Sequence, residues 1–256
     1  MTKQEFKISY SRVNTYLFCP HKYKLVYLDN FHIPINSDIT FGHIIHKTLE
    51  LFHGIGGQSC DVLFECYGSA WKNDGFKNLQ QVFEYYHRGN QMLKNYYISF
   101  CETKPEVLYV EKSFGTNIGK YKFVGIIDRI DKHPDNTYEI MDYKTHIQVW
   151  EQERVDKDLQ LTFYAYACKN IFGFNPDKIS VYFLSDNKKI YSKRTQDDIN
   201  NAVNMAIDIA EKISAESFDP DLSKCFICNF KFKCKHSQFR NIDKIGKATQ
   251  RQYKVV

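Results

Sequence analysis

The feature that most constrains the fold of this chain is a series of three β-rich segments in its middle, at residues 107–114, 121–131 and 138–145. Stretches typical of turns separate them: residues 115–119, which begin and end with glycine, and the sequence His133-Pro134-Asp135-Asn136. Two such short connections between three strands predict an antiparallel meander.

Helices are predicted on both sides of these strands. Residues 9–28 have a helical pattern that is interrupted at Cys19-Pro20, because proline lacks the amide donor that a helix interior needs. Residues 61–101 are again helical, and Gly75 and Gly89 are expected to divide them. The other predicted elements are a helix at 41–52, a helix at 157–170, strands at 178–184 and 188–192, and a helix that Thr195 caps and that ends at Ser214. This order predicts an α/β fold (α+β mixed) in which helices flank a central mixed sheet.

The composition narrows the class of protein. With 256 residues, of which 43% are hydrophobic, the chain can bury a substantial core. Its 35 Lys and Arg exceed its 30 Asp and Glu, and the net charge of +5 permits binding to a polyanion without requiring it. We find neither a secretion signal nor the roughly 18 apolar residues of a membrane span. We therefore expect a cytoplasmic protein with no membrane partner, whose cysteines are thiols or metal ligands.

Two acidic residues and a lysine lie in the strands of the predicted meander. Asp128 follows an apolar pair in one strand, and the next strand places Asp142 and Lys144 on one face, since strand side chains alternate with period two. If these strands pair, Asp128 and Asp142 converge, and paired carboxylates beside a substrate phosphate suit Mg²⁺. An acid and a lysine two residues apart in a strand are usually solvated surface groups, but these acids lie in otherwise apolar strands.

Two further polar groups accompany this pattern. Gln160 and Tyr164 are i, i+4 neighbours on the predicted helix 157–170, where they could hydrogen-bond a lysine or a phosphate. His46 lies on a mainly apolar helix, and a lone helical histidine is more often a satisfied core or surface group than a ligand.

Taken together, four motifs resemble those of the RecB-like branch of the PD-(D/E)xK nuclease superfamily. They are, in chain order, GHIIH with His46, GIIDRID with Asp128, DYKT with Asp142 and Lys144, and QLTFYAYA with Gln160 and Tyr164. The resemblance implies a restriction-endonuclease-like core and a DNA nuclease activity that depends on divalent metal.

The resemblance also implies roles for these residues. His46, Asp128, Asp142 and the carbonyl of Tyr143 would hold Mg²⁺ or Mn²⁺. In the same family the lysine assists the nucleophilic water, and the glutamine and tyrosine position the lysine or the DNA. The matching residues here are Lys144, Gln160 and Tyr164, and together with Asp128 and Asp142 they are the catalytic candidates. The acid before the lysine is Asp rather than Glu, as in many RecB-like members. Glu111, in the preceding strand, is interpreted as structural.

The cysteines near the C-terminus form a second pattern. Cys225, Cys228 and Cys234 are spaced as C-x₂-C-x₅-C, which leaves a tetrahedral metal site one ligand short. His236 could complete a local zinc site, and Cys19 could complete the set from the other end of the chain. The residues alone leave both alternatives open.

The family resemblance favours the second alternative. Nuclease domains of the AddB type and related CRISPR-associated exonucleases carry one cysteine near the N-terminus, often followed by proline, and three at the C-terminus with this spacing. These proteins bind a [4Fe–4S] cluster, and the resemblance implies that Cys19, Cys225, Cys228 and Cys234 do so here. Such a cluster would hold the two ends of the chain together rather than act in redox catalysis.

We therefore expect a single nuclease domain over residues 1–256. Within it we expect a cluster region at 1–30 and 215–240, a helical region at 41–105 and a nuclease core at 106–214. The expected activity is exonucleolytic hydrolysis of single-stranded DNA ends, with a helicase or integrase as a possible partner protein. The alternatives are an inactive DNA-binding subunit of a helicase, recombination or CRISPR adaptation complex, and the same nuclease core stapled by zinc.

The N-terminal helical segment offers candidates for gripping single-stranded DNA. Its cations Arg12, Lys22 and Lys24 alternate with Tyr16 and Tyr23, so charge and base stacking could act together. A solvated helix face explains the same charges equally well.

Overall fold

The expected meander is present in the computed structural model, which describes residues 7–240 of the chain. Strands β2 (Glu106–Ile118), β3 (Tyr121–Lys132) and β4 (Tyr138–Lys144) pair antiparallel in sequence order. The first turn is shorter than predicted, because residues 115–118 continue the ladder with β3 and only Gly119 and Lys120 remain between the strands. Gly119 has a φ of 56°, a left-handed conformation that glycine adopts without steric cost.

Two more strands complete the mixed sheet. Strand β5 (Lys178–Phe183) pairs parallel to β4, and β6 (Lys188–Ser192) pairs antiparallel to β5. A parallel pair cannot be joined by a tight turn. The chain between β4 and β5 therefore crosses over through α6 (Gln152–Asp156), which the sequence did not predict, and α7 (Leu159–Ala167). The whole sheet has the order β1-β3-β4-β5-β6, with β2 also paired to β3.

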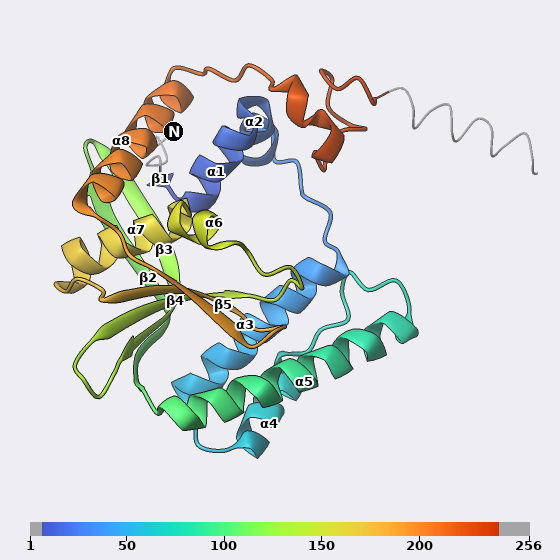
Figure 1. Cartoon of the computed structure of the whole chain (residues 1–256). Helices are drawn as coiled ribbons and strands as arrows, with labels where there is room; N and C mark the ends of the chain where they lie inside the picture. Colours follow the sequence, from blue (N-terminus) through green and yellow to red (C-terminus); the bar gives the residue numbers. More distant parts are fainter. Residues whose placement is uncertain (1–6, 241–256) are drawn as a thin grey trace, which may run out of the picture. The chain divides into compact units, whose positions relative to one another are not determined.

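The remaining elements agree in order with the predicted ones, and the predicted break at Cys19-Pro20 separates α1 from α2 (Figure 1). They are β1 (Lys7–Ile8), α1 (Tyr10–Phe18), α2 (Pro20–Tyr27), α3 (Ser37–Gly54), α4 (Cys60–Ala70), α5 (Leu79–Thr103), the π-helical turn η1 (Cys168–Phe172), α8 (Gln196–Ser214) and the 3₁₀ turn η2 (Leu222–Ile227). Among the described residues, no helix has the length and apolarity to cross a membrane.

The chain divides into two compact units. Of the described residues, unit 1 comprises Lys7 and residues 35–204, and unit 2 comprises residues 8–34 and 205–240. Helices α3 to α7 and strands β2 to β6 belong to unit 1, whereas α1, α2 and η2 belong to unit 2. The division into one domain with three regions stays a prediction.

A hydrophobic core in unit 1 joins α3, α4 and α5 to one face of the sheet. It contains Phe41 and Leu49 of α3, Leu93 of α5, and Met141 and Tyr143 of β4. On the other face, Phe163 of α7 packs against Phe123 of β3, with ring centroids 4.7 Å apart.

Gly89 does not divide the long helical segment, contrary to the prediction. It lies inside α5, where a Cβ atom would overlap the hydroxyl of Tyr67 on α4. Tyr67 donates a hydrogen bond of 3.2 Å to the carbonyl of Tyr86, also on α5. The glycine therefore serves the close approach of two helices, while Gly75 lies in the loop between α4 and α5 as predicted.

Candidate active site

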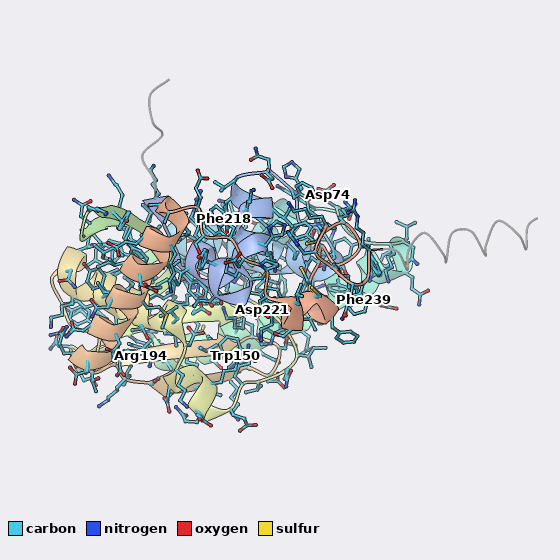
Figure 2. The ribbon with its side chains drawn as sticks, turned by 90° about the horizontal axis from the view of Figure 1, so that it is seen from above. Asp74, Trp150, Arg194, Phe218, Asp221 and Phe239 are labelled. Carbon is cyan, nitrogen blue, oxygen red and sulfur yellow. The ribbon has the colours of Figure 1, made fainter. Side chains whose placement is uncertain are left out.

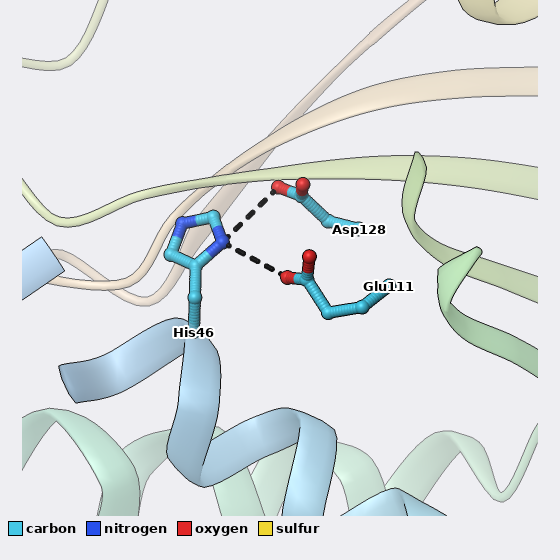
Figure 3. A group of neighbouring side chains, drawn as sticks. All are labelled: His46, Glu111 and Asp128. Carbon is cyan, nitrogen blue, oxygen red and sulfur yellow. Dashed lines mark hydrogen bonds and ion pairs between the residues drawn. The ribbon is translucent and has the colours of Figure 1, made fainter. Parts of the chain in front are cut away.

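A histidine and two carboxylates from three different elements of unit 1 meet in one cluster (Figure 3). Nδ1 of His46 on α3 lies 3.3 Å from Oε1 of Glu111 on β2 and 3.6 Å from Oδ2 of Asp128 on β3. All three ligand atoms lie within 4.8 Å of one another, which suits a single metal ion. Carboxylate oxygens and an imidazole nitrogen are a donor set that Mn²⁺ and Mg²⁺ accept.

Glu111 is a site residue that the sequence interpretation missed, because it was assigned a structural role. Its backbone φ is 43°, a left-handed conformation inside a strand, which is uncommon for a residue with a side chain. In the hairpin, Val110 pairs with Arg129 and Lys112 pairs with Ile127, so Glu111 falls opposite Asp128. Strained backbone of this kind is concentrated at functional sites. Only the hairpin register could have predicted this carboxylate from the sequence.

The electrostatics of the cluster favour an added positive charge. Burial and the neighbouring Asp142 carboxylate raise the pKa of Asp128 to about 7, although His46 and the N–H of Tyr143 oppose the rise. Burial alone would lower the pKa of His46, but the charge of Asp128 and the hydrogen bond to Glu111 raise it to about 9. A bound proton thus reduces the repulsion between the neighbouring carboxylates of the cluster, and a divalent cation would reduce it in the same way.

Lys144 stands beside these acids on β4. Its Nζ lies 2.7 Å from Oδ2 of Asp142 and 3.3 Å from Oε1 of Gln160, to which it donates. Gln160 in turn donates a hydrogen bond of 2.7 Å to the hydroxyl of Tyr164 on α7. Burial would lower the pKa of Lys144, but the carboxylate of Asp142 holds it above the ordinary value, so the lysine is a cation at neutral pH.

Tyr143 contributes its backbone to the site and its side chain to the opposite face of the sheet. Its carbonyl oxygen lies 3.2 Å from Nε2 of His46. Its buried hydroxyl lies 3.0 Å from that of Tyr96 and accepts a hydrogen bond of 3.3 Å from Nη1 of Arg129. Arg129 is fixed by two hydrogen bonds of 2.6 Å to Asp131. Strand β4 is therefore fixed on the face of the sheet opposite the site by a buried network of hydrogen bonds.

The structure gathers most of the predicted site residues around one cavity of about 520 Å³. Asp142 lines it but is paired with Lys144 and is outside the three-residue cluster, while Tyr164 reaches the site only through Gln160. The residues of the predicted set that line the cavity are His46, Asp128, Asp142, Tyr143, Lys144 and Gln160.

Arg88 of α5 also lines this cavity and was not predicted. Its Nη2 donates a hydrogen bond of 3.2 Å to the carbonyl of Thr145, directly after Lys144. Its guanidinium carbon lies 4.3 Å from the ring centroid of Phe41 and 4.6 Å from that of Tyr85. Two rings and a carbonyl thus fix a permanent cation beside the acidic cluster.

Comparison with known families identifies the arrangement. A sequence model described as the PD-(D/E)XK nuclease superfamily matches residues 7–235, most of the chain. The chain belongs to this superfamily. The family resemblance inferred from the four motifs is thereby confirmed.

One solved structure supports the fold of this superfamily member. A crystal structure from Eubacterium rectale, of a protein provisionally named an exonuclease, has 11% sequence identity, covers 84% of each chain and has a TM-score of 0.55. The structure of SSO0001 has 13% identity, covers 88% of this chain and 93% of that one, and has a TM-score of 0.37. No curated protein matches the sequence. The first likeness confirms the predicted fold class, a central mixed sheet flanked by helices as in restriction endonucleases.

In unit 2 of this nuclease-superfamily chain, four cysteines line one pocket. Cys19 at the start of α2 and the C-terminal Cys225, Cys228 and Cys234 all face it, and so does His236. Two backbone amides donate to the sulfurs: the N–H of residue 221 to Sγ of Cys19 at 3.3 Å, and the N–H of residue 230 to Sγ of Cys228 at 3.5 Å. Burial and the three neighbouring thiols raise the pKa of Cys225.

The N-terminal tyrosines are not available for base stacking, contrary to the hypothesis drawn from the sequence. Tyr16 is 6% exposed and Tyr23 is fully buried, because both pack in the core of unit 2. Tyr16 donates a hydrogen bond of 2.6 Å to the carbonyl of Ser217. Arg12 donates a hydrogen bond of 3.0 Å to the hydroxyl of Tyr23 and lies over the ring of Tyr27. The alternation of charge and ring in this segment reflects packing.

Proposed function

We propose that the chain is a divalent-metal-dependent deoxyribonuclease that hydrolyses phosphodiester bonds as an exonuclease on single-stranded ends. The observation that carries the proposal is the cluster of His46, Glu111 and Asp128. Two of its members, His46 and Asp128, line the same cavity as the paired Asp142 and Lys144. Membership of the nuclease superfamily gives the reaction class, and the preference for DNA, single strands and ends rests on the family resemblance.

His46, Glu111 and Asp128 would hold the metal, with the carbonyl of Tyr143 and the carboxylate of Asp142 beside it. When bound, Mg²⁺ or Mn²⁺ lowers the pKa of a bound water and neutralises charge that develops on the phosphate. Asp128 is held in place by the 2.8 Å hydrogen bond from the N–H of Tyr143, which aims its carboxylate at His46. The protein thus holds negatively charged ligands in place before the metal binds.

Lys144 and Arg88 would act on the phosphate itself. Because Asp142 raises the pKa of Lys144, this side chain stays protonated and stabilises negative charge rather than accepting a proton. Gln160, which accepts from Lys144 and is itself fixed by Tyr164, sets the direction of the ammonium group. Arg88, packed against the rings of Phe41 and Tyr85, would bind a phosphate of the strand as a rigid donor.

The four cysteines would bind a [4Fe–4S] cluster as a staple of unit 2. Four thiols that face one pocket, with backbone amides directed at two of the sulfurs, fit a centre with four thiolate ligands. Because His236 lines the same pocket, a zinc ion held by three thiolates and this imidazole is the competing reading. The reducing cytoplasm, the proposed location, would keep the thiols free for either centre.

Anaerobic purification followed by cleavage assays tests this proposal. The chain is incubated with end-labelled single- and double-stranded DNA and with RNA, each with Mn²⁺, with Mg²⁺ or with EDTA. We expect mononucleotides or short products from single-stranded DNA with either metal and none with EDTA or with Lys144→Ala. Binding without cleavage under all conditions would favour the inactive DNA-binding subunit of a helicase, recombination or CRISPR adaptation complex.

A further inference from the structure

The C-terminal segment of unit 2 directs some aromatic side chains inward and others outward. Phe230 and Cys225 are buried, and the ring of Phe230 packs edge-on against that of Phe31, with centroids 6.0 Å apart. Phe226 is 70% exposed and Phe232 is 44% exposed. The labelled residues Asp221 and Phe239 mark this segment in Figure 2. Core packing therefore accounts for Phe230 but not for Phe226 and Phe232, although the ring centroid of Phe226 also lies 6.3 Å from that of Phe239.

A lysine links the two outward rings. Nζ of Lys231 lies 5.5 Å from the ring centroid of Phe226 and 5.3 Å from that of Phe232. The same Nζ donates a hydrogen bond of 3.2 Å to the carbonyl of Phe226. We call Phe226, Lys231 and Phe232 the aromatic–basic surface.

The segment that carries this surface is rich in positive charge, although Asp219 and Asp221 directly precede it. Residues 224–240 contain no aspartate or glutamate. Their cations are Lys224, Lys231, Lys233, Lys235 and Arg240. A docking face for an ordinary apolar partner would not need this excess of positive charge, whereas a polyanion with flat apolar groups matches both features.

We propose that the aromatic–basic surface holds a single nucleic-acid strand, with unpaired bases stacked on Phe226 and Phe232 and a backbone phosphate on Lys231. Aromatic rings with interleaved cations bind single strands in this way, without sequence preference. The site is distinct from the cavity of unit 1, and it rests on the proposed function only in the choice of nucleic acid as partner.

Fluorescence anisotropy with a labelled oligothymidylate tests the proposal on the full anaerobically purified chain in EDTA, where no cleavage occurs. The double variant Phe226→Leu/Phe232→Leu keeps the apolar character but removes the rings, and Phe226→Trp/Phe232→Trp keeps a stacking face. Phe83→Leu on α5 is the matched control, because that ring is 62% exposed in unit 1. We expect the Leu variant to bind at least about fivefold more weakly for each ring lost, and the Trp and Phe83 variants to bind like the parent.

A second measurement separates charge from stacking. Lys231→Gln should reduce the log–log salt slope by about 0.7, the value for one phosphate contact to a single strand, and the Leu variant should leave the slope unchanged. Strand binding by the Leu variant equal to that of the parent would overturn the proposal and indicate an apolar docking face for protein or lipid. Equal losses in Phe83→Leu would overturn it as well, since the effect would then be unspecific.

A second assay distinguishes failure of the strand-binding proposal from failure of the proposed nuclease activity. Cleavage of bis-p-nitrophenyl phosphate with Mn²⁺ needs the metal cluster but offers no strand to stack. The aromatic–basic variants should retain this cleavage while they lose strand binding. If the parent binds the strand in the expected pattern and cleaves neither substrate, the proposed function fails and the surface stands.

Discussion

The backbone N–H of Tyr143 donates a hydrogen bond of 2.8 Å to Oδ2 of Asp128, and this bond joins β3, which carries the metal-ligand candidate Asp128, to β4, which carries Asp142 and Lys144. Asp128 is therefore both a charge in the site and an acceptor in the fold, and these two roles can be separated by mutation.

Asp128→Asn should abolish cleavage and preserve the fold. The amide oxygen can still accept from Tyr143, but the negative charge that would hold the cation is lost. We expect cleavage to fall by about a thousandfold or more, since a catalytic metal contributes several kcal/mol. Calorimetric Mn²⁺ titration should show weakened binding, and the melting temperature in EDTA should be unchanged. Retained cleavage in this variant would refute the site assignment.

Glu111 allows the cost of its backbone conformation to be measured. Glu111→Gly and Glu111→Ala both remove the carboxylate and should both weaken Mn²⁺ binding. Only glycine relieves the left-handed φ of 43°, so the Gly variant should be more stable than the Ala variant by about 1 kcal/mol. Denaturant unfolding in EDTA measures the difference. Unchanged Mn²⁺ affinity in both variants would return Glu111 to the structural role that its sequence first indicated.

Arg88→Lys should weaken substrate binding rather than metal binding. Lysine keeps the charge but loses the planar guanidinium that packs against the rings of Phe41 and Tyr85, so KM should rise by about tenfold, the size of one charged hydrogen bond. Mn²⁺ affinity should be that of the parent. If kcat and the melting temperature fall together while KM is constant, Arg88 serves only to hold the carbonyl of Thr145.

Substitutions at Cys19 and His236 distinguish the two alternative metal centres of unit 2, a [4Fe–4S] cluster and a zinc ion. Cys19→Ala should remove iron and colour as fully as Cys228→Ala, and both should lower the melting temperature. His236→Ala should do neither. Metal analysis and absorption spectra of anaerobic protein give the answer, and the opposite pattern, with zinc lost only from the His236 variant, would establish the local zinc site.

His53 should make the fold sensitive to acid. Burial and the nearby Arg129 guanidinium lower the pKa of His53 to about 2, and its Nε2 lies 3.2 Å from Nη1 of Arg129. The unfolded chain takes up a proton below about pH 6.5 that the folded chain refuses, so the free energy of unfolding falls by up to about 1.4 kcal/mol for each pH unit below that value. Chemical denaturation between pH 7 and pH 5 should show a smaller slope for His53→Gln. His87→Gln, at an exposed position of α5, is the control.

Much of the fold was predictable because its strongest signals are local. Strand alternation placed Asp142 and Lys144 on one face, and the salt bridge between them confirms that placement. Proline chemistry located the boundary between α1 and α2 at Cys19-Pro20. These features depend on residues that are neighbours in the sequence.

The sequence-based predictions were wrong where the role of a residue depends on contacts with residues far away in the sequence. Gly89 resembles a helix breaker in sequence, yet its role is set by Tyr67 of another helix. Tyr16 resembles a stacking residue until the chain folds and places Ser217 beside it. Glu111 and Arg88 enter the site through hairpin register and helix packing, for which the motifs carry no signal.

The two faces of β4 have a consequence for anyone who screens this protein for loss of function. Asp142 and Lys144 face the cavity, while the side chain of the residue between them is tied to Tyr96 and Arg129 on the far side of the sheet. A library of random substitutions would therefore yield two kinds of inactive variant at neighbouring positions of β4. Clones altered at Asp142 or Lys144 would express well and remain inert, whereas clones altered at Tyr143 would be lost to proteolysis before any assay. Sorting the inactive variants by the yield of folded protein would thus show which side chains of β4 face the cavity and which face the core.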